Sequence, residues 1–308
     1  MEVVYDYKEY KGREVALAFG NFDGVHLGHN YVISTVKNLS IEKDIPSAVL
    51  TFEPHPASIL FNKKDFRLTD VKQKIEFIKN HSIDYLYIIN FDQNFAKMTP
   101  EYFIQEVLIN SYQTKYIVTG HECVFGYKRL GNLKLIKDFA ATCDYKIVEL
   151  NSLSIEDNTV YSSSLIRECL ICGHIEFANK LLGRPYCMSG TVVKGVGRGR
   201  KIGFPTINLN IDDDMVKPKF GVYFAKVVQN NNHFYGLVNI GVRPTFEDFK
   251  KPILEMYIFD FNDNLYDHLV KIEFLKFLRP EKKFSDAEEL IAQIRSDVIE
   301  ARKLKDCL

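Results

Sequence analysis

Two histidines three residues apart, His26 and His29, have a type and spacing that could act on a phosphate group. They follow an apolar run at residues 15–19 and precede apolar residues at helical spacing, so they fall at a predicted strand-to-helix turn. The free backbone N–H groups and the helix dipole favour an anion at such a turn. Imidazoles there could hold the phosphates of a nucleoside triphosphate and stabilise charge on an in-line transition state.

Small and turn-forming residues beside the histidines fit the same interpretation, because they let the backbone approach a ligand closely. The candidate ATP-binding residues of this turn are Gly20, Asn21, Phe22 and Gly28. The alternative is a pair of helix-start histidines with solvent or core partners, since the motif is short.

Two further segments strengthen the nucleotide interpretation. Three hydroxyls and a cation open another predicted helix and form a second potential anion cradle: Ser162, Ser163, Ser164 and Arg167. A strand end is followed by residues that could shape a pocket for a flat ligand: Phe52, Pro54, His55 and Pro56. The alternatives are a serine N-cap with a surface arginine for the first segment and a rigid turn for the second.

A second constellation lies far along the chain, where a loop combines glycines with cations and suits polyphosphate. Its candidate residues are Gly195, Gly197, Arg200, Lys201 and Gly203. Thr206 and Asn208 follow at alternating positions of a predicted strand, so their side chains share one face. A hydroxyl and an amide oxygen are hard ligands that suit Mg²⁺. A basic solvated hairpin is the alternative for the loop.

Glu255 stands inside an otherwise apolar strand. A carboxylate in that place could accept a proton from a substrate hydroxyl. A glutamate at a strand edge or in a salt bridge is the alternative. Two different nucleotide sites on one chain predict consecutive steps on one substrate.

Composition limits the classes of function. At 308 residues the chain exceeds the usual size of one hydrophobic core, so we expect two domains. Lys+Arg and Asp+Glu number 40 each, which predicts no bulk attraction to nucleic acid or to a membrane. No signal peptide or membrane-spanning stretch is visible, so we expect a cytoplasmic protein. The sequence leaves open whether it is a homo-oligomer.

The cysteine pattern predicts no metal centre. Six cysteines are scattered along the chain, and in a cytoplasmic protein of this size they favour buried or idle thiols. Cys169 and Cys172 have a redox-like spacing near His174, but they lie in a helical pattern without a second such pair. Thiols on a helix are the favoured interpretation.

The elements that must position these residues change in kind near residue 184. Before it, apolar strand-like runs at residues 15–19, 47–52, 85–89, 116–119 and 145–148 alternate with helical patterns. This alternation predicts a Rossmann-like α/β domain, a parallel sheet with helices on both faces, and ligands at the carboxyl ends of its strands. After it, short β-rich runs predict a small antiparallel barrel. We therefore expect domains at 1–183 and 184–308.

Two helix starts can be named from capping residues. Thr99 is the expected N-cap of a helix with Pro100 in its first turn. Ser285 is the expected N-cap of the last helix, with Glu288 at the capping-box position.

The N-terminal motifs resemble the adenylyltransferase half of bacterial bifunctional riboflavin kinase/FAD synthetases. The resemblance runs in order through residues 20–29, 51–56, Phe125-Gly126 with Arg129 and Gly131, 162–167 and 181–186. It implies FMN adenylyltransferase activity, with His26 and His29 acting on the triphosphate of ATP. It implies FMN contacts at Phe52, Pro54, His55, Pro56, Glu122 and Arg129.

The C-terminal motifs are similar to the riboflavin kinase half of the same family, through residues 194–208, 239–246, 259–261, 265–266, 278–279 and 283–284. The resemblance implies a six-stranded barrel with a terminal helix, Thr206 and Asn208 at Mg²⁺, and Glu255 as base toward the 5′-hydroxyl of the ribityl chain. It adds Pro205 to the ATP contacts and Asn239, Arg243 and Arg279 as flavin contacts.

The expected function is therefore two-step flavin synthesis: phosphorylation of riboflavin by ATP to FMN, then adenylylation of FMN by ATP to FAD and pyrophosphate. Riboflavin, FMN, FAD and ATP are the expected partners. Glu122 and Cys123 depart from the family's pattern, where Asp or Asn and an aromatic residue are usual. The alternatives are a riboflavin kinase with a degenerate adenylyltransferase domain and a flavin-binding sensor.

Overall fold

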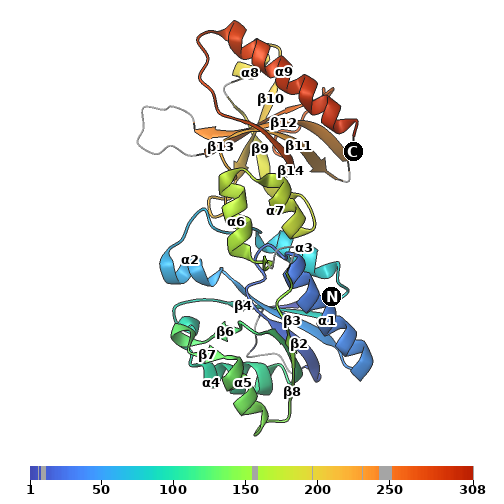
Figure 1. The fold of residues 1–308 in the computed structure, drawn as a ribbon, viewed down its shortest axis with the longest axis vertical. Coiled ribbons are helices and arrows are strands. Elements are labelled where there is room, and N and C mark those ends of the chain that lie inside the picture. The colour runs from blue at the N-terminus through green and yellow to red at the C-terminus, as the bar shows by residue number, and fades with distance from the viewer. Residues whose placement is uncertain are drawn as a thin grey trace. The chain divides into compact units, whose positions relative to one another are not determined.

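The computed structural model describes residues 1–5, 7, 12–154, 159–195, 197–230, 232–242 and 252–307, without the side chains of Arg198 and Val242. The chain divides into two compact units, Met1–Ser163 and Ser164–Leu308. Figure 1 shows the elements of each unit, with strands as arrows and helices as coils.

The first unit is built on a six-stranded sheet in which every neighbouring pair is parallel. Its order is β1 (Glu2–Val4), β4 (Tyr85–Asn90), β3 (Ser47–Glu53), β2 (Val15–Phe19), β5 (Thr114–Gly120) and β8 (Lys146–Leu150). The five strands predicted from apolar runs are confirmed as β2, β3, β4, β5 and β8. β1 is an additional short strand at one edge of the sheet.

Both faces of this sheet are covered, as the sequence pattern predicts. Val15 and Leu17 of β2 pack into one apolar cluster and Ala16 and Ala18 into another, because successive side chains of a strand point to opposite faces. The first cluster includes residues of the π-helical η2 (Phe103–Ser111), which follows α4 (Pro100–Tyr102), and of α5 (Leu133–Ala140). The second includes residues of α1 (Leu27–Lys43) and α3 (Val71–Lys79).

Shorter elements join these layers. They are α2 (Pro56–Phe61), η1 (Phe95–Lys97), η3 (Tyr127–Arg129) and the hairpin of β6 (Val124–Phe125) with β7 (Gly131–Asn132). Thr99 is the N-cap of α4, as predicted, and its hydroxyl accepts a hydrogen bond from the backbone N–H of Tyr102 at 3.2 Å.

The second unit contains a closed antiparallel barrel of six strands. Their order is β10 (Thr206–Ile211), β13 (Pro252–Ile258), β12 (Asn232–Val242), β11 (Gly221–Gln229), β14 (Leu269–Pro280) and β9 (Tyr186–Val193). The helices are α6 (Ser163–Cys172), α7 (Ile175–Leu182), α8 (Arg198–Lys201) and α9 (Ala287–Lys305). The expected six-stranded barrel with a terminal helix is confirmed.

Helix α9 covers part of the outer face of the barrel (Figure 1). Ala301 of α9 is fully buried in an apolar cluster with Val222, Phe224 and Leu237 of β11 and β12. The expected cap of this helix is wrong by one residue, because Asp286 is the N-cap and its carboxylate accepts from the backbone N–H of Glu289. Ser285 instead donates its hydroxyl hydrogen to Glu289 at 3.0 Å.

Helices α6 and α7 precede the predicted domain boundary near residue 184 but belong, apart from Ser163, to the second compact unit. Asn179 of α7 explains part of this assignment, because its amide donates to the carbonyl of Phe274 and accepts from the N–H of Tyr186. Domains at 1–183 and 184–308 stay a prediction about where each function resides.

Candidate active sites

The turn between β2 and α1 holds the two histidines in one compact arrangement. His26 is the N-cap of α1, is only 4% exposed, and accepts the backbone N–H of His29 at Nδ1 over 3.3 Å. Its Nε2 is therefore the ring's N–H donor. The His26 and His29 rings stack with centroids 3.6 Å apart.

Neighbouring residues explain the shape of this turn. A Cβ on Gly28 would lie 3.1 Å from both His26 Cε1 and Tyr161 Cβ, so glycine makes room for the capping ring. Phe22 packs its ring edge-on against His29 at 5.2 Å. The first turn of α1 carries no acidic side chain, which leaves the helix N-terminus suited to an anion.

One residue of the predicted serine segment, Ser163, contacts the same turn. The hydroxyl of Ser163 donates to the backbone carbonyl of Asp23 at 2.8 Å, across 140 residues of sequence. Ser163 therefore lies beside the turn of residues 20–29 within the first unit. Ser162 directly precedes this contact, whereas Ser164 and Arg167 belong to the second unit, and their role at the triphosphate stays a prediction.

The predicted FMN contacts fall in two places. Phe52 lies at the carboxyl end of β3, and His55 caps α2 by accepting the N–H of Ala57 at 3.1 Å. Pro54 and Pro56 flank this cap, so the turn is rigid. Glu122 and Arg129 are exposed near the β6–β7 hairpin.

Sequence reasoning missed an aromatic cluster that accompanies Phe52. The Phe52 ring lies 5.8 Å from the rings of Phe91 and Phe95, and Phe19 lies 5.5 Å from Phe125. Phe19, Phe52 and Phe91 each stand at or just after the carboxyl end of a sheet strand. Such strand ends are where open parallel sheets bind ligands. A search for aromatic residues at predicted strand ends would have found them.

In the barrel, the residues predicted for kinase chemistry form one row across neighbouring strands. Asn208 of β10 pairs in register with Glu255 of β13, which pairs with Asn239 of β12. The row continues through Val222 of β11 to Arg279 of β14. Directly opposed residues of antiparallel strands place their side chains on the same face, with Cβ atoms about 4.5–5.5 Å apart. The structure thus assembles an amide, a carboxylate and a second amide side by side.

Thr206 stands on the same strand face as Asn208, two residues earlier. Two glycines of the preceding loop lie directly against these side chains. A Cβ on Gly195 would collide with the carboxamide of Asn208, and a Cβ on Gly199 would lie 3.3 Å from the Thr206 hydroxyl. The Gly/Arg-rich loop is therefore folded over the two predicted magnesium ligands.

The other predicted loop residues surround this contact. Gly197 and Gly203 adopt φ of 73° and 87°, a region that favours glycine. Arg200 and Lys201 are exposed on α8, and Pro205 directly precedes β10. Arg243 lies outside the described residues.

Arg279 is bound within the barrel unit itself. Its Nε donates to both carboxylate oxygens of Asp297 at 3.0 Å, and its Nη2 donates to Oδ2 at 2.7 Å. Asp297 is 4% exposed on α9 and also accepts from Gln293 at 2.8 Å. Arg279, the predicted flavin contact at the β14 end of the row, therefore also links α9 to β14.

The donor set near Thr206 fits a magnesium ion that takes most of its ligands from phosphates and water. Thr206, Asn208 and Glu255 supply oxygen atoms, which such a hard cation prefers. The described residues contain no group of three or more His, Cys, Asp or Glu side chains that could hold a metal. The unpaired thiols, Cys169 and Cys172 among them, agree with the prediction of free cysteines.

Comparison with known proteins places both halves of the chain. A family model described as FAD synthetase matches residues 8–164, and one described as riboflavin kinase matches residues 182–305. A bifunctional riboflavin kinase/FMN adenylyltransferase of Bacillus subtilis is 38% identical over 299 residues, which cover 96% of this chain and 93% of the relative. The corresponding protein of Buchnera aphidicola is 37% identical, covering 92% and 91%.

The chain belongs to the bifunctional riboflavin kinase/FMN adenylyltransferase family. A crystal structure described as a macrolide-efflux protein of Streptococcus pneumoniae has the same fold, with a TM-score of 0.88 at 27% identity over 97% of this chain and 98% of that one. None of the described helices is long and apolar enough to span a bilayer.

Two residues that depart from the family's usual pattern, Glu122 and Cys123, differ in their burial. Glu122 is exposed, and Cys123 packs against the aromatic and aliphatic cluster of the first unit. Burial raises the pKa of the Cys123 thiol, so it behaves as a small apolar side chain rather than as a nucleophile.

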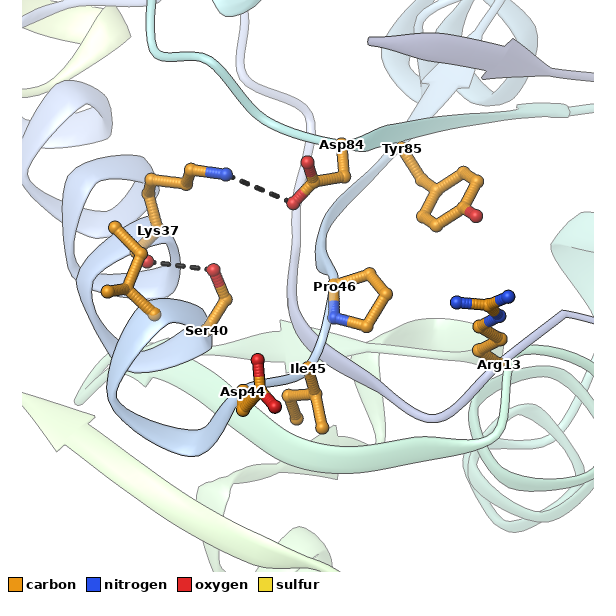
Figure 2. Close-up of a pocket in the computed structure, with 9 residues that line it drawn as sticks. Arg13, Lys37, Ser40, Asp44, Ile45, Pro46, Asp84 and Tyr85 are labelled. Carbon is orange, nitrogen blue, oxygen red and sulfur yellow. Dashed lines mark hydrogen bonds and ion pairs between the residues drawn. The ribbon is translucent and has the colours of Figure 1, made fainter.

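A groove of about 510 Å³ lies at the amino ends of β3 and β4, whereas the histidines follow the carboxyl end of β2. Figure 2 shows the Lys37 ammonium group of α1 directed at Asp84 and the Ser40 hydroxyl directed at the Lys37 carbonyl, with Arg13 and Tyr85 on the other side. Lys37 and Asp84 form an ion pair at 3.1 Å. The groove contains none of the predicted site residues.

Proposed function

We propose that this chain is a bifunctional enzyme that phosphorylates riboflavin to FMN and then adenylylates FMN to FAD, with ATP as donor in both steps. Membership in a family whose relatives match over nearly the whole chain supports both activities. The row of Asn208, Glu255 and Asn239 supports the first step most directly, because three residues chosen from separate strands stand side by side.

In the first step, the carboxylate of Glu255 accepts the proton of the ribityl 5′-hydroxyl. The hydroxyl oxygen then bonds to the γ-phosphorus of ATP while the bond from that phosphorus to the bridging oxygen breaks, which yields FMN and ADP. Asn239 stands next to Glu255 in register and orients the flavin side of the substrate. The loop at Gly195 and Gly199 covers the phosphates.

Thr206 and Asn208 would hold a magnesium ion in the same place. Bound Mg²⁺ would neutralise charge on the phosphates of ATP. A cytoplasmic location and the predicted flavin contacts Arg243 and Arg279 also belong to the proposal.

In the second step, an oxygen of the FMN phosphate attacks the α-phosphorus of another ATP, and pyrophosphate leaves. No side-chain nucleophile is required. The Nε2–H of His26, the ring of His29 and the backbone N–H groups at the start of α1 stabilise the triphosphate by hydrogen bonds and by the helix dipole. The aromatic cluster around Phe52 offers a flat apolar wall for the flavin ring.

The decisive experiment separates the two reactions in one protein. Purified chain is given riboflavin with ATP and Mg²⁺, or FMN with ATP and Mg²⁺, and the flavin products are separated. We expect FMN and FAD from the first mixture and FAD from the second. An absence of FMN would refute the kinase assignment, and FMN that is never converted to FAD would refute the adenylyltransferase assignment.

Glu255→Gln tests the proposed base. This variant keeps the size and a hydrogen-bonding group but cannot accept the proton, so we expect FMN formation to fall by about 10²–10⁴-fold. Riboflavin binding, followed by flavin fluorescence, should persist. Conversion of supplied FMN to FAD by the same preparation is the internal control, and normal FMN formation would remove Glu255 from this role.

A further inference from the structure

A buried network of hydrogen bonds supports the turn that carries His26. The side chains of this network have no role in the proposed chemical steps. The carboxylate of Asp23, 2% exposed, accepts the backbone N–H groups of Leu68 and Thr69 at 3.0 and 3.1 Å. The Thr69 hydroxyl accepts the backbone N–H of Gly24 at 3.1 Å. The segment just before α3 therefore anchors the end of the turn.

A second anchor holds the start of the turn. The hydroxyl of Thr51, 1% exposed on β3, donates to the backbone carbonyl of Asn21 at 3.0 Å. Lys74 of α3, 3% exposed, donates from Nζ to the same hydroxyl at 3.3 Å and to the Phe52 carbonyl at 3.4 Å. A donor that is itself hydrogen-bonded to an ammonium group makes a stronger bond to its own acceptor.

Burying the Lys74 ammonium group costs free energy, because the charge loses its contact with water. Burial lowers the pKa of its ammonium group, while attraction by Asp23 and Glu53 opposes the change and Arg67 adds to it. Fully buried lysines occur almost only where they are paired. Lys74 donates hydrogen bonds to the Thr51 hydroxyl and the Phe52 carbonyl, so its burial supports the carboxyl end of β3.

The backbone of the turn shows why anchors are needed. Phe22 and Val25 have φ of 45° and 38°, a left-handed conformation that side chains with a Cβ rarely adopt. Such a conformation costs about 1–3 kcal/mol per residue and persists only where the surroundings impose it. Val25 directly precedes His26, so relaxation of this backbone would turn the imidazole and the first N–H groups of α1 away from one another.

We propose that Thr51 and Lys74 are positioning residues of the adenylyl-transfer site, which hold the strained turn of residues 21–25 in the form that directs His26 and the α1 N-terminus at the triphosphate. The inference rests on the proposed function of this turn as the ATP site. Neither side chain needs to touch ATP. Because misplacement of about 1 Å can cost 10²-fold in rate, we expect the loss of the Thr51 hydroxyl to lower kcat/KM for ATP by about 10–100-fold.

Thr51→Val removes the hydroxyl and keeps the shape, whereas Thr51→Ser keeps the hydroxyl. Thr114→Val is the matched control, because Thr114 is 3% exposed on β5 of the same sheet and its hydroxyl has no hydrogen-bond partner within the described part of the chain. FAD formation from FMN is measured over a range of ATP concentrations, and FMN formation from riboflavin is measured on the same preparations. Hydrogen exchange of peptides covering residues 20–29 reports on the turn itself.

We expect Thr51→Val to raise KM for ATP, lower kcat and speed exchange in residues 20–29, while Thr51→Ser and Thr114→Val resemble wild type. Lys74→Met should give the same effects, and the double variant with Thr51→Val should lose no more than either single one. Wild-type kinetics and exchange in Thr51→Val would overturn the inference alone. A wild-type chain that makes no FAD would overturn the proposed function, and this inference with it. Should Thr51→Val prove unfolded by circular dichroism, Lys74→Met decides by the same criteria.

Discussion

The pair of Arg279 and Asp297 allows a test of whether a residue at the kinase site acts on the flavin or through the fold. Family resemblance implies that Arg279 contacts the flavin, whereas its guanidinium makes three hydrogen bonds to Asp297 of α9. Replacing either partner breaks the same ion pair, but only one replacement removes the arginine. Arg279→Gln and Asp297→Asn therefore distinguish the two roles.

The stability cost follows from the burial of the pair. Removing one partner of a buried ion pair costs about 3–5 kcal/mol, because the other charge stays desolvated. The side chain of Asp297 is 5% exposed and that of Arg279 is 19% exposed, so water recovers part of this cost. We expect about 2–3 kcal/mol for either single variant. For a unit of this size that lowers Tm by roughly 4–12 °C. The double variant should recover part of the loss, since it leaves no unpaired charge.

Thermal unfolding and FMN formation are measured for both single variants and for the double variant. If Arg279 acts by fastening α9 to β14, the two single variants should change KM for riboflavin alike when assayed well below their melting temperatures. An increase in KM above about tenfold in Arg279→Gln alone would refute this reasoning and make Arg279 a flavin ligand. FAD formation from FMN should stay normal in all three variants.

Three further predictions concern single residues. Gly195→Ala would drive a methyl group into the Asn208 carboxamide, so FMN formation should fall by at least tenfold while FAD formation from FMN stays unchanged. Gly28→Ala should have the opposite pattern, because its methyl group would lie 3.1 Å from the His26 ring; product analysis with each substrate checks both variants. Burial lowers the pKa of Lys74 below its ordinary 10.5, so the unfolded chain binds more protons in the window just below 10.5. The free energy of unfolding of wild type should therefore rise relative to Lys74→Met as the pH increases toward 10.5, as urea titrations at several pH values would measure.

Much of the fold could be predicted because it depends on local patterns. The buried runs of β2, β3 and β4 are apolar on both faces, as a covered parallel sheet requires, and these strands contain the runs predicted at residues 15–19, 47–52 and 85–89. The short β-rich runs after residue 184 likewise identify the barrel strands. The shift of the α9 cap from Ser285 to Asp286 shows the limit, since either residue can accept the required hydrogen bond.

The sites were predictable only as separate residues. Thr206 and Asn208 share a strand, so their common face follows from the sequence, but their register with Glu255 and Asn239 depends on pairing between distant strands. The hydrogen-bond network that supports the histidine turn is even harder to predict from the sequence. Thr51 and Lys74 resemble an ordinary strand threonine and a surface helix lysine until burial is known, since lysine is nearly always exposed.

The two candidate sites share one packing feature. In each, a polar side chain that the proposed function places at a phosphate lies against a glycine: His26 against Gly28, and Asn208 against Gly195. In each, a buried apolar residue lies in the adjoining strand: Ala18 of β2, which leads into the histidine turn, and Leu209 of β10, which follows Asn208. The polar groups therefore keep few alternative rotamers, and little conformational entropy remains to be lost when ATP binds. This preorganisation explains how a parallel sheet and an antiparallel barrel, which share no topology, can both serve ATP-dependent transfer in one chain.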